Sequence, residues 1–211
     1  MSINFCDARW LYEPKQHVVN QDKVTITTEP FTDFWQRSFF GLSNDNAPAL
    51  LIENSDNVTF TLKVGMDYRK QFDQCGLLVY INNDNWFKAS IEYETDTISR
   101  LGTVVTNFGY SDWASVDICP TEVVWYRLSR RGPDFLIEYS LDGESFMQMR
   151  IFHMHKLGQT TVEMGNAYNP LPTKQSIRFG VYASSPLLSS FEAVFSEFKF
   201  ESCRWGAYDE A

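Results

Sequence analysis

The sequence of 211 residues has little that points to metal, redox or nucleic-acid chemistry. Its four cysteines, Cys6, Cys75, Cys119 and Cys203, are scattered and form no C-x-x-C pair, so neither zinc nor a redox dithiol is indicated. Lys and Arg number 18 against 27 Asp and Glu, a formal net charge of −9 that disfavours a nucleic-acid partner. We therefore expect reduced, mostly buried thiols and no cofactor.

Long apolar segments and compositional breaks are also missing. No basic segment followed by an apolar stretch opens the chain, and no apolar run approaches the roughly 20 residues that span a bilayer. No low-complexity stretch, Pro/Ser-rich linker or fixed-period repeat divides the sequence. We therefore expect a cytoplasmic protein with no membrane partner, folded as one domain over residues 1–211.

Aromatic and β-branched residues dominate what is present. Aromatic side chains make up 16% of the sequence, with 17 Phe, 10 Tyr and 6 Trp, and they suit both a thick core and the lining of a pocket. Short alternating segments bounded by Gly, Asn, Asp or Pro recur along the chain. The fold class is therefore all-β, with nine or more strands predicted in residues 23–30, 57–66, 76–82, 86–94, 102–108, 125–132, 134–154, 176–184 and 191–202.

Turn residues within these segments predict a first hairpin. Asp142 and Gly143 form a pair that tolerates positive φ, which tight hairpin turns require. The strands on either side of this pair are therefore expected to pair with each other.

A second hairpin is predicted in residues 76–94, GLLVYINNDNWFKASIEYE. A three-residue loop over 83–85 keeps its apolar residues on one face, whereas a two-residue loop would mix the faces. With the longer loop, Tyr80 pairs with Lys88, and Gly76 lies opposite Glu92.

The two faces of this hairpin differ in chemistry. The core-facing set is Leu77, Val79, Ile81, Phe87, Ala89, Ile91 and Tyr93. The other set is Leu78, Tyr80, Trp86, Lys88, Ser90, Glu92 and Glu94. A face that mixes large aromatics with isolated charges suits either the solvated outside of an antiparallel sheet or the floor of a groove for a polar ligand.

Five segments, in this order, resemble the regulation-of-enolase-like family (domain of unknown function 1349). They are TDFWQRSFFG (32–41), QCGLLVYINNDNWFKASIEYE (74–94), VVTNFGYSDWAS (104–115), WYRLSRRGPDFLIEYSLDGESF (125–146) and FGVYASSP (179–186). The resemblance implies a concanavalin A-like jelly roll, a sandwich of two curved antiparallel sheets that also occurs in lectins, glucanases and accessory domains of glycoside hydrolases.

On that fold the concave sheet carries carbohydrate sites, so the resemblance also implies a ligand-binding set. Its members are aromatic side chains that can stack on sugar rings and polar groups that can bond to hydroxyls. They are Trp35, Arg37, Tyr80, Lys88, Glu92, Asn107, Asp112, Trp113, Arg127 and Glu138.

For some of these residues the sequence also predicts a place in the fold. Trp35 and Arg37 are expected to share one face of an extended segment, and Asp112 and Trp113 to lie in a loop at the rim. For two of these residues a structural role is an alternative to ligand binding. Trp35 could belong to the core. Arg127 could act only as the cross-strand ion-pair partner of Glu138.

Catalytic motifs are weak. Glu92, Glu94 and Asp96 have the alternate spacing of a glucanase-type carboxylate set, but the order of Asp and Glu departs from that pattern and Asp96 is expected beyond the strand end. His153 and His155 share a strand face without an evident third metal ligand. No G-x-S-x-G nucleophile motif is present.

Three functions therefore remain open. The first is binding of a small polar ligand, a carbohydrate or sugar phosphate, on the concave face. The second is a glycoside hydrolase or another sugar-active enzyme, and the third is a protein-interaction or regulatory module. For the first, we expect Lys88→Ala and Glu92→Ala to impair binding while leaving folding largely intact.

Overall fold

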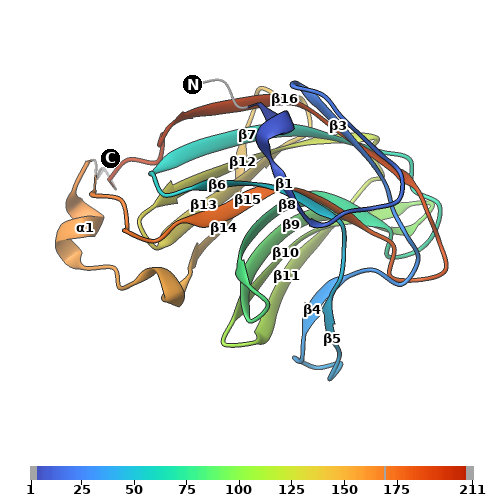
Figure 1. Cartoon of the computed structure of the whole chain (residues 1–211), viewed down its shortest axis with the longest axis horizontal. Helices are drawn as coiled ribbons and strands as arrows, with labels where there is room; N and C mark the ends of the chain where they lie inside the picture. Colours follow the sequence, from blue (N-terminus) through green and yellow to red (C-terminus); the bar gives the residue numbers. More distant parts are fainter. Residues whose placement is uncertain (1–3, 169, 208–211) are drawn as a thin grey trace.

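The computed structural model describes residues 4–168 and 170–207 and is a β-sandwich jelly roll of two seven-stranded antiparallel sheets (Figure 1). The first sheet has the order β1-β6-β15-β8-β9-β10-β11 and the second β14-β13-β12-β7-β16-β3-β2. The strands are β1 (Arg9–Tyr12), β2 (His17–Val19), β3 (Lys23–Thr27), β4 (Phe34–Gln36), β5 (Ser43–Asp45), β6 (Ala49–Asn54), β7 (Val58–Met66), β8 (Gln74–Asn82), β9 (Asn85–Thr95), β10 (Ile98–Asn107), β11 (Tyr110–Ile118), β12 (Val123–Arg131), β13 (Asp134–Ser140), β14 (Met147–His153), β15 (Ile177–Ser184) and β16 (Glu192–Ser202).

The apolar face of each sheet faces the other sheet. Leu77, Phe87 and Ile91 of the first sheet are fully buried in one cluster with Phe60 and Tyr126 of the second. Strand alternation explains this arrangement, because every second side chain along a strand points to the same face. The all-β class and the predicted hairpin at Asp142-Gly143, which joins β13 to β14, are thereby confirmed.

The hairpin of β8 and β9 keeps the predicted faces but not the predicted register. Tyr80 pairs with Trp86 rather than Lys88, so the strands are slipped by two residues, and a slip of two returns every side chain to the same face. The turn has two residues, Asn83 and Asp84, and the predicted three-residue loop is wrong. A bulge at Ile81 inserts one unpaired residue into β8, and this extra residue keeps the apolar side chains of both strands on one face.

The slip also changes the part that Gly76 plays. Gly76 lies opposite Ser90, and Glu92 lies opposite Gln74. A Cβ at Gly76 would lie 2.0 Å from the carbonyl oxygen of Ala89, so this glycine lets two backbones approach closely. The expected position of Gly76 opposite Glu92 is therefore wrong.

A small two-stranded sheet, β4 with β5, stands on the face of the first sheet that points away from the second sheet (Figure 1). Phe34 of β4 is fully buried there against the rings of Tyr80, Trp86 and Tyr182. The molecule thus has a second, smaller apolar cluster outside the main core, and this cluster fixes the β4–β5 hairpin above the sheet.

Helices are few and short. They are η1 (Phe5–Asp7), η2 (His155–Leu157) and α1 (Val162–Asn166). None of the helices in the described part of the chain has the length and apolar composition that a membrane crossing requires.

All four cysteines lie among the described residues, and none forms a disulfide. Cys75 is buried and Cys203 half-buried, whereas Cys6 and Cys119 are exposed. The expectation of mostly buried thiols is therefore wrong for two of the four. Cys6 lies in the short helix η1 and Cys119 follows the last residue of β11, both at the surface.

Candidate ligand-binding groove

A groove of about 530 Å³ lies between the outward face of the first sheet and the β4–β5 hairpin. Alternation along the strand that begins the hairpin explains one wall. Phe34 and Gln36 are buried beneath it, while Asp33 and Trp35 face the groove. The outward residues of β8, β9 and β10 form the floor, and Trp113 of β11 lines the groove with them.

The floor centres on a buried cation. Nζ of Lys88 donates to Oδ1 of Asp33 and to Oε1 of Gln74, both at 3.0 Å, and Lys88 is only 4% exposed. Nε2 of Gln74 in turn donates to Oε2 of Glu92 at 2.9 Å. Four residues from three separate segments therefore form one continuous hydrogen-bonded network.

Glu92 is the most perturbed carboxyl in this network. Burial raises its pKa to about 7, the nearby charges of Asp33 and Glu94 act in the same direction, and Lys88 and Arg100 oppose them. Near neutral pH this carboxyl is therefore present in both the acid and the carboxylate form. A shift of this kind in a groove is typical of groups that bind or transfer protons.

The walls of the groove are aromatic and apolar. Trp35 packs edge to face against Phe40, with ring centroids 5.3 Å apart. The guanidinium of Arg100 lies 5.5 Å from the ring of Trp113. A Cβ at Gly102 would lie 3.0 Å from Nε1 of Trp113, so the glycine leaves room for the indole against the sheet.

Arg100 is held by two carboxylates. Its guanidinium lies 3.3 Å from Oε2 of Glu94 and donates through Nε to Oδ1 of Asp117 at 3.2 Å. Arg100 and Lys88 are thus both paired within the chain, and among the described residues that line the groove no cation is left free for a ligand.

The family model of the proteins of unknown function DUF1349 matches residues 10–203. The chain belongs to this family. Regulation of enolase protein 1 of Saccharomyces cerevisiae (strain ATCC 204508 / S288c) is 29% identical over 189 residues, which cover 89% of this chain and 86% of that protein. A crystal structure of a functionally unknown protein from Saccharomyces cerevisiae has a TM-score of 0.79 at 27% identity, covering 94% of this chain and 98% of that one.

More distant solved structures share the fold with this DUF1349 member. A mutant of the GH43 protein BlXynB from Bacillus licheniformis has a TM-score of 0.67 at 12% identity, covering 93% of this chain and 37% of that one. An alginate lyase from Klebsiella pneumoniae has a TM-score of 0.55 at 11% identity, covering 86% and 82%. At such identities the likeness concerns the fold alone.

The structure brings four residues of the sequence-predicted set together in the groove: Trp35, Lys88, Glu92 and Trp113. Sequence reasoning did not include Asp33, Gln74 and Arg100. Asp33 precedes Trp35 by two residues, and this spacing was a signal that could have placed it on the same face.

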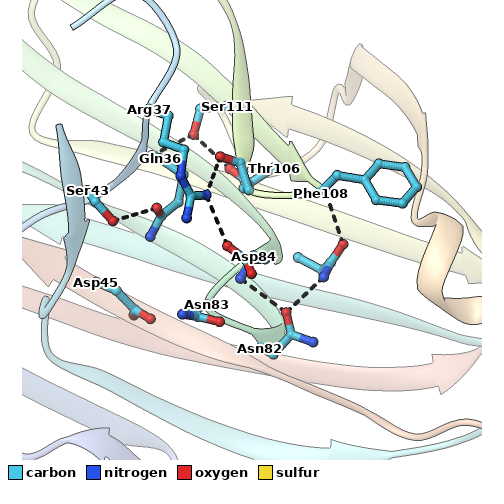
Figure 2. A network of polar contacts seen from close by, with 12 residues as sticks. Gln36, Arg37, Ser43, Asp45, Asn82, Asn83, Asp84, Thr106, Phe108 and Ser111 are labelled. Carbon is cyan, nitrogen blue, oxygen red and sulfur yellow. Dashed lines mark hydrogen bonds and ion pairs between the residues drawn. The ribbon is translucent and has the colours of Figure 1, made fainter. Parts of the chain in front are cut away.

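Arg37 and Asp112 make contacts of other kinds. Arg37 does not share a face with Trp35, because its positive φ of 56° ends the extended segment. Its Nη1 donates to Oδ1 of Asp84 at 3.1 Å and to the carbonyl of Gly109 at 2.7 Å, in a network that ties the β4–β5 hairpin to two neighbouring turns (Figure 2). Asp112 accepts from Arg150 at 2.7 Å.

The predicted rim loop at Asp112 and Trp113 is a strand instead. Both residues lie in β11, which pairs with β10 along its whole length. The segment is mostly exposed because β11 is the edge of the first sheet, and this explains its loop-like polar composition.

Tyr80 and Asn107 also lie apart from the groove. The hydroxyl of Tyr80 donates to Oδ2 of Asp45 at 3.0 Å, and its ring belongs to the cluster around Phe34. Nδ2 of Asn107 donates to the carbonyl of His153, and its Oδ1 lies 2.8 Å from Nδ1 of His155.

Arg127 and Glu138 belong to the other sheet. They form a two-bond ion pair, with both N···O distances at 2.7 Å, on adjacent strands β12 and β13. They line a separate cavity of about 610 Å³. The sequence could not separate them from the groove residues, because strands of both sheets show the same alternation.

The structure also places the carboxylates of the glucanase-type set and tests for groups of metal ligands. Glu92 and Glu94 both line the groove, whereas Asp96 lies beyond the end of β9 and accepts a hydrogen bond from Tyr93. Within residues 4–168 and 170–207, no group of three or more His, Cys, Asp or Glu side chains is arranged to hold a metal ion.

Proposed function

We propose that this protein binds a neutral carbohydrate in the groove between the β4–β5 hairpin and the first sheet. The observation that carries the proposal is the combination of a hydrogen-bonded polar floor, with Lys88 buried and Glu92 half-buried, and aromatic walls at Trp35 and Trp113. Sugar rings present apolar C–H faces to aromatic rings and hydroxyls to polar groups, so they match both surfaces.

The charges of the groove favour a neutral ligand over a sugar phosphate. Lys88 is paired with Asp33 and Arg100 with Glu94 and Asp117, so an incoming phosphate would have to displace a carboxylate. Hydroxyl groups need no free charge, because they can add hydrogen bonds to ions that are already paired. The volume of about 530 Å³ lies within the usual range for small-molecule sites.

The experiment is a calorimetric and thermal-shift screen with neutral mono- and disaccharides, sugar acids and sugar phosphates. We expect a neutral saccharide to bind, and Trp113→Ala to lower its affinity at least about tenfold, a loss of roughly 1.4 kcal/mol. Tyr110→Ala is the matched control, because Tyr110 is an exposed aromatic on the same strand outside the groove. The proposal fails if no saccharide binds, or if Trp113→Ala and Tyr110→Ala behave alike.

A second candidate is regulation of a protein partner, supported by the name of the yeast relative, Regulation of enolase protein 1. Three large apolar side chains are exposed in the β4–β5 hairpin, at Phe39, Phe40 and Leu42. Such a surface suits protein contact. An assay of enolase activity with and without this protein tests this role, and Phe39→Ser should abolish any effect that depends on the hairpin.

A further inference from the structure

The orientation of the Gln74 amide is determined by its neighbours. Gln74 is only 3% exposed, and its Oε1 accepts from Nζ of Lys88 at 3.0 Å and from the hydroxyl of Tyr182 at 3.1 Å. Its Nε2 donates to Oε2 of Glu92 at 2.9 Å and to the carbonyl of Phe72 at 3.3 Å. Because a lysine ammonium can only donate and a carbonyl oxygen can only accept, the reverse orientation is excluded.

This orientation determines which oxygen of Glu92 can carry a proton. Oε2 faces an N–H donor, so a hydroxyl there would bring two donors together. The acid proton therefore belongs on Oε1. Oε1 makes no hydrogen bond to any residue in the described part of the chain, and Glu92 lines the groove.

The charged groups around Glu92 come from every neighbouring segment. They are Lys88 and Glu94 on β9, Arg100 on β10 and Asp33 before β4, and the phenol of Tyr68 after β7 is a titratable but uncharged neighbour. The two cations are already held by carboxylates within the chain. Burial is the largest influence on the pKa of Glu92 and raises it to about 7, so the carboxylate form is poorly compensated.

We propose that Glu92 meets the bound saccharide as an uncharged carboxylic acid that donates a hydrogen bond from Oε1 to a ligand oxygen, so that binding takes up a proton at neutral pH. This inference rests on the proposed function. A neutral sugar displaces water from Oε1 and brings no cation in exchange, which disfavours the carboxylate further. The proton comes from solvent, and no covalent bond changes.

Gln74 is thus a positioning residue, because it directs the proton of Glu92 toward the ligand. The ligand class follows as well. A neutral saccharide with hydroxyl or ether oxygens accepts the hydrogen bond, whereas a protonated amino sugar would favour the carboxylate and release a proton on binding.

The test uses the full chain and the neutral saccharide that binds most tightly among glucose, galactose, mannose, xylose, cellobiose and xylobiose. Titrations near pH 7 in phosphate and in Tris, whose ionisation enthalpies differ, should show uptake of about half a proton per site, since the pKa of Glu92 is about 7. Affinity should fall about tenfold from pH 6 to pH 8. Glu92→Gln should remove this pH response. The control Glu144→Gln should retain it, because Glu144 is exposed between β13 and β14 and does not line the groove.

Titration of the free protein adds a readout that needs no ligand. The side-chain carboxyl carbon of Glu92, followed by NMR, should titrate near pH 7, and a midpoint near the ordinary 4.5 overturns the inference. A saccharide that binds with the same affinity at pH 6 and pH 8, or with proton release, overturns this inference alone. If no saccharide binds, the proposed function fails and the inference fails with it.

Discussion

Nζ of Lys88 lies 3.0 Å from Oδ1 of Asp33, although the two residues are 55 positions apart in the chain. Lys88 comes from the middle of a central strand, and Asp33 precedes the first strand of the β4–β5 hairpin. This ion pair therefore joins the hairpin to the sheet at the floor of the groove. Because the ion pair links the two sides of the groove, the hairpin and the sheet are held in one fixed arrangement around it.

Loss of the Lys88 ammonium should cost stability, contrary to the expectation that substitution of this residue leaves folding intact. The side chain is 5% exposed, so Lys88→Met removes from Asp33 and Gln74 the hydrogen bonds that a buried ammonium donates. We expect the free energy of unfolding in urea to fall by about 2–4 kcal/mol. Lys63→Met is the control, because Lys63 pairs with the half-exposed Glu197 and should change stability by less than about 1 kcal/mol.

Burial of Glu92 should make stability depend on pH in a defined direction. Because its pKa rises from 4.5 to about 7 on folding, the folded chain retains a proton that the unfolded chain has released between these values. The contribution is full below pH 4.5 and is lost as pH rises through about 7. From pH 4.5 to about 7.5, wild type should lose on the order of 2 kcal/mol relative to Glu92→Gln in urea denaturation. Parallel curves for the two proteins would contradict this expectation.

Gly76 should not tolerate a side chain. A Cβ there would lie 2.0 Å from a backbone oxygen of the neighbouring strand, which cannot move aside as a side chain can. We expect Gly76→Ala to lower the free energy of unfolding by about 3 kcal/mol or more. Gly65→Ala is the control, because its nearest contact would be an ordinary 3.7 Å, and thermal denaturation of both variants makes the comparison.

The four thiols should differ in their reactivity. Cys6 and Cys119 are exposed and should react quickly with Ellman's reagent in the native protein. Cys75 is fully buried, and burial raises its pKa above the usual range, so it should react only after unfolding. Mass spectrometry after alkylation without reductant identifies the labelled residues, and rapid labelling of Cys75 would show that the core opens readily.

Much of the fold could be predicted from the period-two alternation, and the departures have local causes. The faces of the β8–β9 hairpin were predicted correctly and its register was not, because a bulge at Ile81 leaves no mark in an alternating sequence. The predicted ranges did not include β1, β2, β4, β5, β6 or β11. Of these, β2, β4 and β5 have three residues each, too few to show a period.

The groove could be predicted only in part, because its residues meet through tertiary packing. Lys88 and Glu92 were predicted from one hairpin. Their partners Asp33 and Gln74 were not among the residues that we assigned to the polar and aromatic face of that hairpin. Gln74 lies two residues before Gly76, on the continuation of β8, and only the observed register places it opposite Glu92. Alternation also cannot distinguish the outer faces of the two sheets, which is why Arg127 was assigned to the groove.

The aromatic walls give the groove an optical property. Two of the chain's six tryptophans, Trp35 and Trp113, line it, and Trp113 is 42% exposed to water. Indole emission depends on the polarity around the ring, so a molecule that replaces water there changes the fluorescence of the unlabelled protein. Trp125, whose ring lies on the second sheet beneath Nζ of Lys63, does not line the groove, so its own emission should not respond to such a molecule.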